Sequence, residues 1–199
     1  DQAQMTLEEL RAAVDESKQA GRKVAAHAHG ASGIKNAIRA GAHSIEHATL
    51  MDEEATGLFE THGVYMVPTL SALATTGACR RGCGIPKRHQ SSFRQAHERG
   101  LLIAMGTDAG TPFNHHGDNA QELERMVALG MSPMEAILAS TSAAARLIGF
   151  EMQIGTIAPG KEADLLLVEG NPLRRIDMLR DRRRLVGVMQ AGRFVAGAL

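Results

Sequence analysis

The sequence predicts an α/β fold built on a parallel sheet. Apolar segments of strand length alternate with amphipathic segments of helix length over the first 150 residues, at the spacing of βαβ units. The chain has 199 residues, of which 44% are hydrophobic, and this is enough for a sizeable core. After residue 150 the pattern changes to short strands separated by Gly turns. We therefore expect two regions, residues 1–150 and residues 151–199.

The elements of the first region follow from helix caps and periodicity. Residues 6–21 are expected to form a helix, because Thr6 and Glu9 fit a capping box and Gly21 is a common type of helix end. Residues 70–86, rich in Gly and Thr, are expected to form a loop. The other expected elements are, in order, strand 23–29, helix 32–41, strand 43–48, helix 52–63, strand 64–70, helix 86–100, strand 101–110, helix 118–130 and helix 132–149.

This alternation contains four helix–strand units. A closed (β/α)8 barrel needs eight units and typically about 250 residues. Four units predict an open parallel sheet, so the first region looks like half of a barrel.

Composition excludes several classes of partner. The formal net charge is zero, whereas binding to nucleic acid or to an anionic membrane favours a basic excess. The basic stretch 179–185 is expected to be a solvated turn, and no apolar run is long enough to span a bilayer. Cys79 and Cys83 are expected to be reduced thiols in a loop. No signal peptide opens the chain, but it also lacks an initiator Met, so we expect that the native N-terminus is missing; the expected location is cytoplasmic, with a signal peptide in the missing part left open.

Three groups suited to metal binding or proton transfer fall at strand ends. His27 ends the first predicted strand, His47 ends the second, and Asp108 ends the fourth. Barrel enzymes build their sites at the C-terminal ends of strands, and neutral imidazoles suit zinc. A lone histidine at a strand end is more often a hydrogen-bonded structural residue, and this is the interpretation for His43, His62, His89 and His97. For His27 and His47 with Asp108, agreement of spacing, face and strand end favours a site.

Further side chains are candidates for substrate contact. His29 shares a strand face with His27. The loop of residues 106–119 follows the Asp108 strand and offers Asn114 and His116, and long loops of this kind commonly contact substrate. The alternative interpretation is an ordinary Gly-rich turn whose polar groups face water.

The ordered motifs resemble a known family. They are "VAAHAHGASGIKNAIRAGAHSIEHATLMDEEA", "VYMVPTL", "GTDAGTPFNHHGDNAQELERMVALG" and "IGTIAPGKEADLLLVEGNPL", which together extend over nearly the whole chain. The set is similar to the amidohydrolase superfamily, in its imidazolonepropionase-like and prolidase-like branch. Some members of that branch are dipeptidases that cleave a C-terminal Pro, Arg or Lys.

The resemblance implies a fold and roles for individual residues. His27 and His47 match metal-binding histidines on barrel strands five and six, and Asp108 matches the metal-binding, proton-shuttling aspartate of strand eight. Tyr65, on the seventh strand, would polarise the scissile carbonyl while metal-activated water attacks it. The ligands imply zinc or another divalent metal, one or two ions per intact barrel. The fold would be strands five to eight of a TIM barrel, followed by short strands of a small β-sandwich.

The sequence also departs from the family pattern. Family members carry a His-x-His motif on the first strand, and this branch often carries a Lys on the fourth. Residues 27–30, "HAHG", have the letters of the first motif, but the His47 and Asp108 strands follow them at the spacing of strands five to eight. We therefore expect that neither the first-strand nor the fourth-strand segment is in this sequence. We therefore expect a fragment of a longer hydrolase of carbon–nitrogen bonds, weak or inactive alone. The intact protein would take a small-molecule or dipeptide substrate and form a homo-oligomer. The alternative is a non-catalytic half-barrel module that pairs with another chain.

Overall fold

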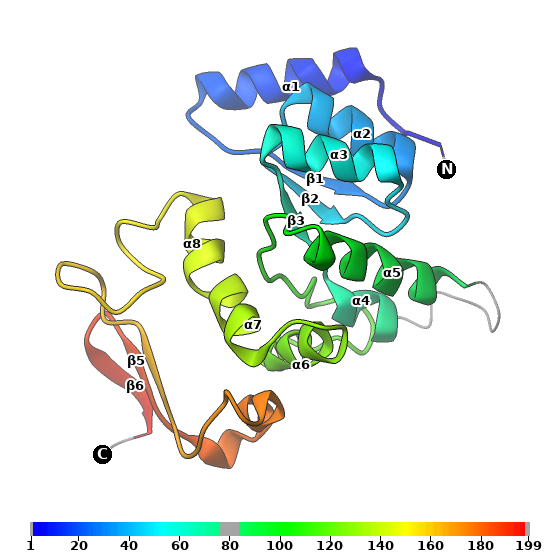
Figure 1. Ribbon diagram of the computed structural model, residues 1–199. Coiled ribbons are helices and arrows are strands. Elements are labelled where there is room, and N and C mark those ends of the chain that lie inside the picture. Colours follow the sequence, from blue (N-terminus) through cyan, green and yellow to red (C-terminus); the bar gives the residue numbers. More distant parts are fainter. Residues whose placement is uncertain (1, 76–83, 198–199) are drawn as a thin grey trace.

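The fold was analysed in a computed structural model that describes residues 2–75 and 84–197. Figure 1 shows its elements coloured along the chain, with a parallel sheet near the N-terminus and a separate sheet near the C-terminus. Cys79 and Cys83 lie outside the described residues, so the expectation of reduced thiols stays a prediction. None of the described helices is long and apolar enough to cross a membrane.

The expected parallel sheet is confirmed for its first three strands. They are β1 (Ala25–Ala28), β2 (Ser44–His47) and β3 (Tyr65–Val67), hydrogen-bonded in that order. The expected strand 101–110 joins the sheet only through a parallel bridge between Ile103 and Met66. On its other side Met105 N–H donates to the carbonyl of Ala139 in a helix at 2.9 Å, instead of to a neighbouring strand.

Three helices cover one face of this sheet, as Figure 1 shows. They are α1 (Leu7–Gln19), α2 (Ala31–Ala40) and α3 (Glu53–His62). The predicted capping box of α1 is present, with the Thr6 hydroxyl accepting from Glu9 N–H at 3.2 Å. Both α2 and α3 end at a glycine with left-handed backbone, as the sequence predicted. The short loops after these helices return the chain to the next parallel strand.

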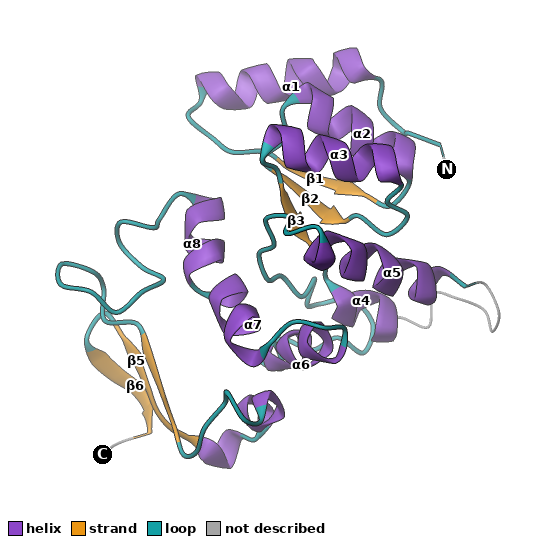
Figure 2. Ribbon diagram, viewed as in Figure 1, coloured by secondary structure: helices purple, strands orange, loops and turns teal. Residues whose placement is uncertain are grey.

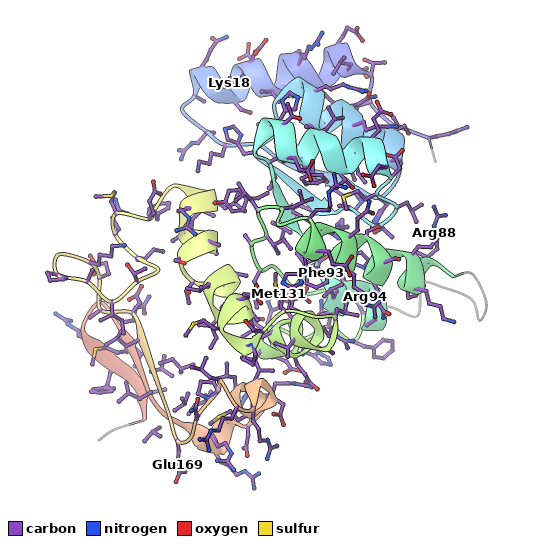
Figure 3. All side chains as sticks on the ribbon, in the orientation of Figure 1. Lys18, Arg88, Phe93, Arg94, Met131 and Glu169 are labelled. Atoms are coloured by element: carbon purple, nitrogen blue, oxygen red, sulfur yellow. The ribbon has the colours of Figure 1, made fainter. Side chains whose placement is uncertain are left out.

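The core lies between the sheet and the helices. Ile34, Ile45, Phe59 and Met66 are fully buried there, and burying a side chain of this size is worth about 1.5–3 kcal/mol. Figure 3 shows Phe93 and Met131 in the interior beside α5, and both belong to the same buried cluster. The strand ends that carry polar side chains are therefore attached to a packed base.

The remaining helices differ from expectation at two places. Helix α4 (Leu70–Thr75) begins inside the segment expected to be a loop, and α5 (Ile85–Glu98) follows the undescribed residues. After α6 (Ala120–Ala128), the expected helix 132–149 divides into α7 (Pro133–Ser140) and α8 (Ser142–Ile148). The division falls at Thr141, whose backbone angles of φ −122° and ψ −90° leave the helical region.

The region after residue 150 contains a second sheet, drawn apart from the first in Figure 2. Strands β4 (Leu165–Val168), β5 (Leu185–Gln190) and β6 (Arg193–Gly197) pair antiparallel, in agreement with the expected short strands. Two short 3₁₀ helices, η1 (Ile176–Arg180) and η2 (Arg182–Arg184), hold most of the basic stretch. Its arginines are only partly solvated as expected, because Arg180 pairs with Asp118 at 3.0 Å and Glu124 at 2.8 Å.

Candidate metal centre

Three histidines meet at the C-terminal ends of β1 and β2. His27 lies on β1, His29 directly follows this strand, and His47 ends β2. The parallel register pairs Ala28 with His47, which brings the two strand ends level. His47 Nε2 lies 2.8 Å from His27 Nδ1, and one nitrogen of each of the three rings lies within 4.8 Å of the others. The predicted convergence of His27 and His47 is present, and His29 joins them.

Two threonine hydroxyls orient the rings. The hydroxyl of Thr69 lies 2.5 Å from His47 Nδ1, and that of Thr49 lies 2.8 Å from His29 Nδ1. Each contact engages one nitrogen and leaves Nε2 directed elsewhere, which is how outer hydrogen bonds fix the tautomer of metal-binding histidines. Both threonines follow strands of the same sheet, and both are buried.

The environment of His47 and His29 favours the neutral imidazole. Burial, aided by the neighbouring histidines, lowers the pKa of His47 to about 3. Burial is also the main cause that lowers the pKa of His29, followed by the proximity of His27, while Asp108 acts in the opposite direction. A neutral imidazole has a free lone pair, so these rings are suited to hold a divalent cation at neutral pH.

The backbone at these strand ends adopts an uncommon conformation. His47, Thr69 and Asp108 have φ of 73°, 50° and 54°, in the left-handed region that favours glycine. Such a conformation costs roughly 1–2 kcal/mol for a residue with a side chain. Strain of this kind persists where the surrounding structure enforces it, and it is common at functional sites.

Asp108 lies near the cluster without belonging to it. It is exposed, and its charge acts on His29 and also raises the pKa of Glu46, for which burial is the larger cause. Its chain segment approaches β3 closely at Gly106, where a Cβ atom would lie 2.5 Å from Val67 Cγ1. Glycine is therefore required at this position to bring the Asp108 segment against the sheet.

The loop after Asp108 contains the two residues expected to contact substrate. Asn114 is 1% exposed, and its amide donates to the carbonyls of Thr107 at 2.6 Å and Asp108 at 3.0 Å. Its oxygen accepts from Gln121 Nε2 at 3.1 Å, so the side chain is engaged in holding the loop. The expected contact of Asn114 with substrate stays a prediction. His116 is exposed.

The structure does not bring Tyr65 to the histidines. Tyr65 begins β3 and pairs with Ser44, whereas His47 lies at the opposite end of β2. Three residues of strand separate these levels, or roughly 10 Å at about 3.3 Å per residue. The expected role of Tyr65 comes from the family resemblance and not from the strand pattern, and it stays a prediction.

Two buried polar residues near the cluster were not predicted as part of it. His89 of α5 is 1% exposed, and its Nε2 donates to the carbonyl of His47 at 3.0 Å. Glu122 of α6 is fully buried and accepts from backbone amides that follow Thr69. In the sequence, helical spacing could have indicated that both residues are buried. His89 shares a helix face with buried Phe93 and Ala96, and Glu122 shares one with buried Met126.

Comparisons with known proteins agree with this geometry. Residues 1–195 match the family described as the amidohydrolase family. The chain is 34% identical to ochratoxinase from Aspergillus niger over 98% of its own length and 42% of that protein. It is 39% identical to a Xaa-Pro dipeptidase crystallised with bound methionine, with a TM-score of 0.90 over 98% of this chain and 50% of that one. It is 29% identical to imidazolonepropionase from Rubrobacter xylanophilus, over 78% of this chain and 35% of that protein. The chain thus spans half or less of the length of these relatives.

Proposed function

The chain belongs to the amidohydrolase family, and we propose that it supplies strands five to eight of a (β/α)8 barrel that hydrolyses carbon–nitrogen bonds with a divalent metal. The observation that carries this proposal is the convergence of His27, His29 and His47 at one end of a parallel sheet. The open sheet supports the barrel assignment, because half of a barrel presents such a sheet. Residues 1–150 would form the barrel part, and residues 151–199 would contribute to a small β-sandwich beside it.

The donor set fits zinc or a similar ion. His27 Nδ1 and His47 Nε2 face one another, and Asp108, whose charge acts on His29, is the proposed further ligand. When bound, such an ion would acidify water and polarise an amide carbonyl. The chain's own contribution is to present neutral imidazoles, to hold His47 through Thr69, and to offer a carboxylate. That carboxylate, Asp108, would accept a proton from the attacking water and pass it to the departing nitrogen.

The substrate proposed is a small molecule with an amide bond, with a dipeptide as the foremost class. The likeness to a Xaa-Pro dipeptidase supports this class. His116 is the proposed substrate contact in the loop after Asp108, because its ring lies against Gly110, where a Cβ would meet Nε2 at 3.3 Å. His29 faces the same end of the sheet and would contact either the ion or the substrate.

Metal binding by the 199-residue chain is the direct test. Calorimetric titration with zinc is expected to give stoichiometric binding to the wild type and none to His47→Ala. His62→Ala is the matched control, since His62 ends α3, away from the cluster, and is exposed. Equal zinc binding by the wild type and His47→Ala, or none by either protein, would count against the proposed centre.

The open sheet also supports a second candidate function, a half-barrel that pairs with another chain. Within the described residues β1 pairs on one side only, with β2, and its outer side carries unpaired backbone groups. Light scattering after size exclusion separates the two candidates. A folded monomer of the 199-residue chain at all concentrations argues against the pairing module. A complex of two or more copies with a defined mass argues for it.

A further inference from the structure

The carboxylate of Glu122 is a buried charge that the proposed reaction does not use. It lies in the first turn of α6 and is 0% exposed. Its two oxygens accept from the amides of Leu70 at 2.7 Å and Ser71 at 2.8 Å, 52 and 51 residues away in the sequence. Burying a carboxylate is costly, and burial raises the pKa of Glu122 although the two amides, the Ser71 side chain and the charge of Arg125 all act against this rise. The position therefore calls for a specific role.

The amides that Glu122 binds directly follow a residue of the histidine cluster. Thr69 precedes Leu70, and its hydroxyl lies 2.5 Å from His47 Nδ1. The backbone of Thr69 has φ of 50°, so its side-chain direction depends on an enforced chain path. Fixing the next two amides by charge-assisted bonds enforces that path.

The arrangement also differs from ordinary helix capping. Thr69 immediately precedes α4, a position where a threonine hydroxyl normally accepts from the second or third amide of the helix. Here the second amide, that of Ser71, donates to Glu122 instead, and the hydroxyl of Thr69 faces His47. Glu122, which belongs to α6, thus accepts the amides at the start of α4. The hydroxyl of Thr69 is left to contact His47 Nδ1.

We propose that Glu122 is a positioning residue for His47. By accepting the first two amides of α4, it keeps the Thr69 hydroxyl on His47 Nδ1, so that Nε2 of the ring faces His27. The consequence for metal affinity rests on the proposed function. The orientation and tautomer of the ring do not, because both are measurable in the metal-free protein.

The test is a two-bond ¹H–¹⁵N correlation spectrum of the histidine rings in metal-free, ¹⁵N-labelled protein. The variants are Glu122→Gln, which replaces one acceptor by a donor, and Thr69→Val, which removes the hydroxyl at similar shape. The matched controls are Glu124→Gln, a partly exposed acid on the same helix that pairs with Arg180, and Thr69→Ser, which keeps the hydroxyl. His47→Gln assigns the His47 signals.

In the wild type and both controls, His47 is expected to populate one tautomer, with the proton on Nδ1 bound to Thr69. In Glu122→Gln and Thr69→Val, the ¹⁵N chemical shifts of His47 Nδ1 and Nε2 are expected to approach each other, because the ring then exchanges between its two tautomers. Wild-type His47 signals in Glu122→Gln would overturn the proposal, whether or not Thr69→Val changes them. If Glu122→Gln gives no cooperative thermal transition, Glu122→Asp, which retracts the oxygens by one methylene, is judged by the same outcomes.

Zinc titration separates this proposal from the proposed function. Glu122→Gln is expected to weaken zinc binding by roughly tenfold, the lower end of the range for residues that orient a ligand. Equal affinities of the wild type and Glu122→Gln would overturn the positioning role. Absence of zinc binding in the wild type would count against the metal centre, and the ring spectra would still decide the role of Glu122.

Discussion

His27 and His47 face each other through Nδ1 and Nε2 at 2.8 Å, although 20 residues separate them in the sequence. With the proton of His47 on Nδ1, as proposed above, the hydrogen of this contact would belong to His27 Nδ1. His27 Nδ1 would then have to give up this hydrogen before it could hold the proposed divalent ion.

The third ring allows a prediction about ligand number. His29→Ala is expected to lower zinc affinity by tenfold or more, because its ring offers the third nitrogen donor of the cluster. Calorimetric titration beside His62→Ala measures this. If His29 contacts only the substrate, zinc affinity will be unchanged in His29→Ala.

Asn114 holds the backbone at Asp108, and its removal has two expected effects. Asn114→Ala is expected to destabilise the protein by about 1–3 kcal/mol, since it removes the amide donor to the Thr107 carbonyl and one of two donors to the Asp108 carbonyl, which keeps the Thr111 hydroxyl at 3.0 Å. Urea unfolding measures this loss. The amide of Gly110, which donates to the Asn114 carbonyl at 2.9 Å, is expected to exchange its hydrogen faster. His115→Ala, at an exposed neighbour, should change stability by less than about 0.5 kcal/mol. A similarly small effect of Asn114→Ala would contradict the holding role.

The close approach at Gly106 predicts a compensating pair. Gly106→Ala places a Cβ 2.5 Å from Val67 Cγ1 and is expected to cost about 1–3 kcal/mol in the free energy of unfolding. Val67→Ala removes the clashing methyl, so the double variant should lose less stability than the sum of the single variants. If the stability losses of the two single variants simply add in the double variant, the methyl group at position 106 does not contact Val67 and the predicted clash is wrong.

Burial of His89 predicts a pH dependence of stability in the metal-free protein. Burial lowers the pKa of His89 from 6.5 to about 4, so between these values the unfolded chain binds the extra proton. Stability from neutral His89 is therefore complete above about pH 6.5 and decreases as the pH falls toward 4. The stability difference between the wild type and His89→Gln should shrink between pH 7 and pH 4.5 by on the order of 2 kcal/mol, at about 1.4 kcal/mol per pH unit. Buried Glu122, whose pKa is raised, acts oppositely but equally in both proteins. A pH-independent difference would exclude this account.

Much of the fold and part of the centre could be predicted from the sequence. Period-two alternation and strand ends placed His27 and His47 together, because these patterns are local and parallel strands end at one edge. The strand level of Tyr65 could not be predicted, since a continuous apolar run has no internal marker of where pairing begins. The break at Thr141 carries no Pro or Gly signal.

The contacts of Glu122 could not be predicted from the sequence either, because they are long-range. A glutamate in a helix is usually solvated, and no local pattern announces that its partners are amides 51 and 52 residues away. The same applies to Gln121, which meets Asn114 across the loop. Such contacts arise from tertiary packing and become visible only when the chain is folded.

The left-handed backbone at His47, Thr69 and Asp108 has a consequence for engineering. Glycine would adopt the same angles without the steric cost of roughly 1–2 kcal/mol that a side chain adds. At His47 and Thr69 that relief is opposed by the loss of buried, hydrogen-bonded side chains. At exposed Asp108 nothing comparable opposes it, so a search for thermostability alone would favour glycine there and would remove the proposed proton acceptor. Stabilising substitutions should therefore be sought away from Asp108.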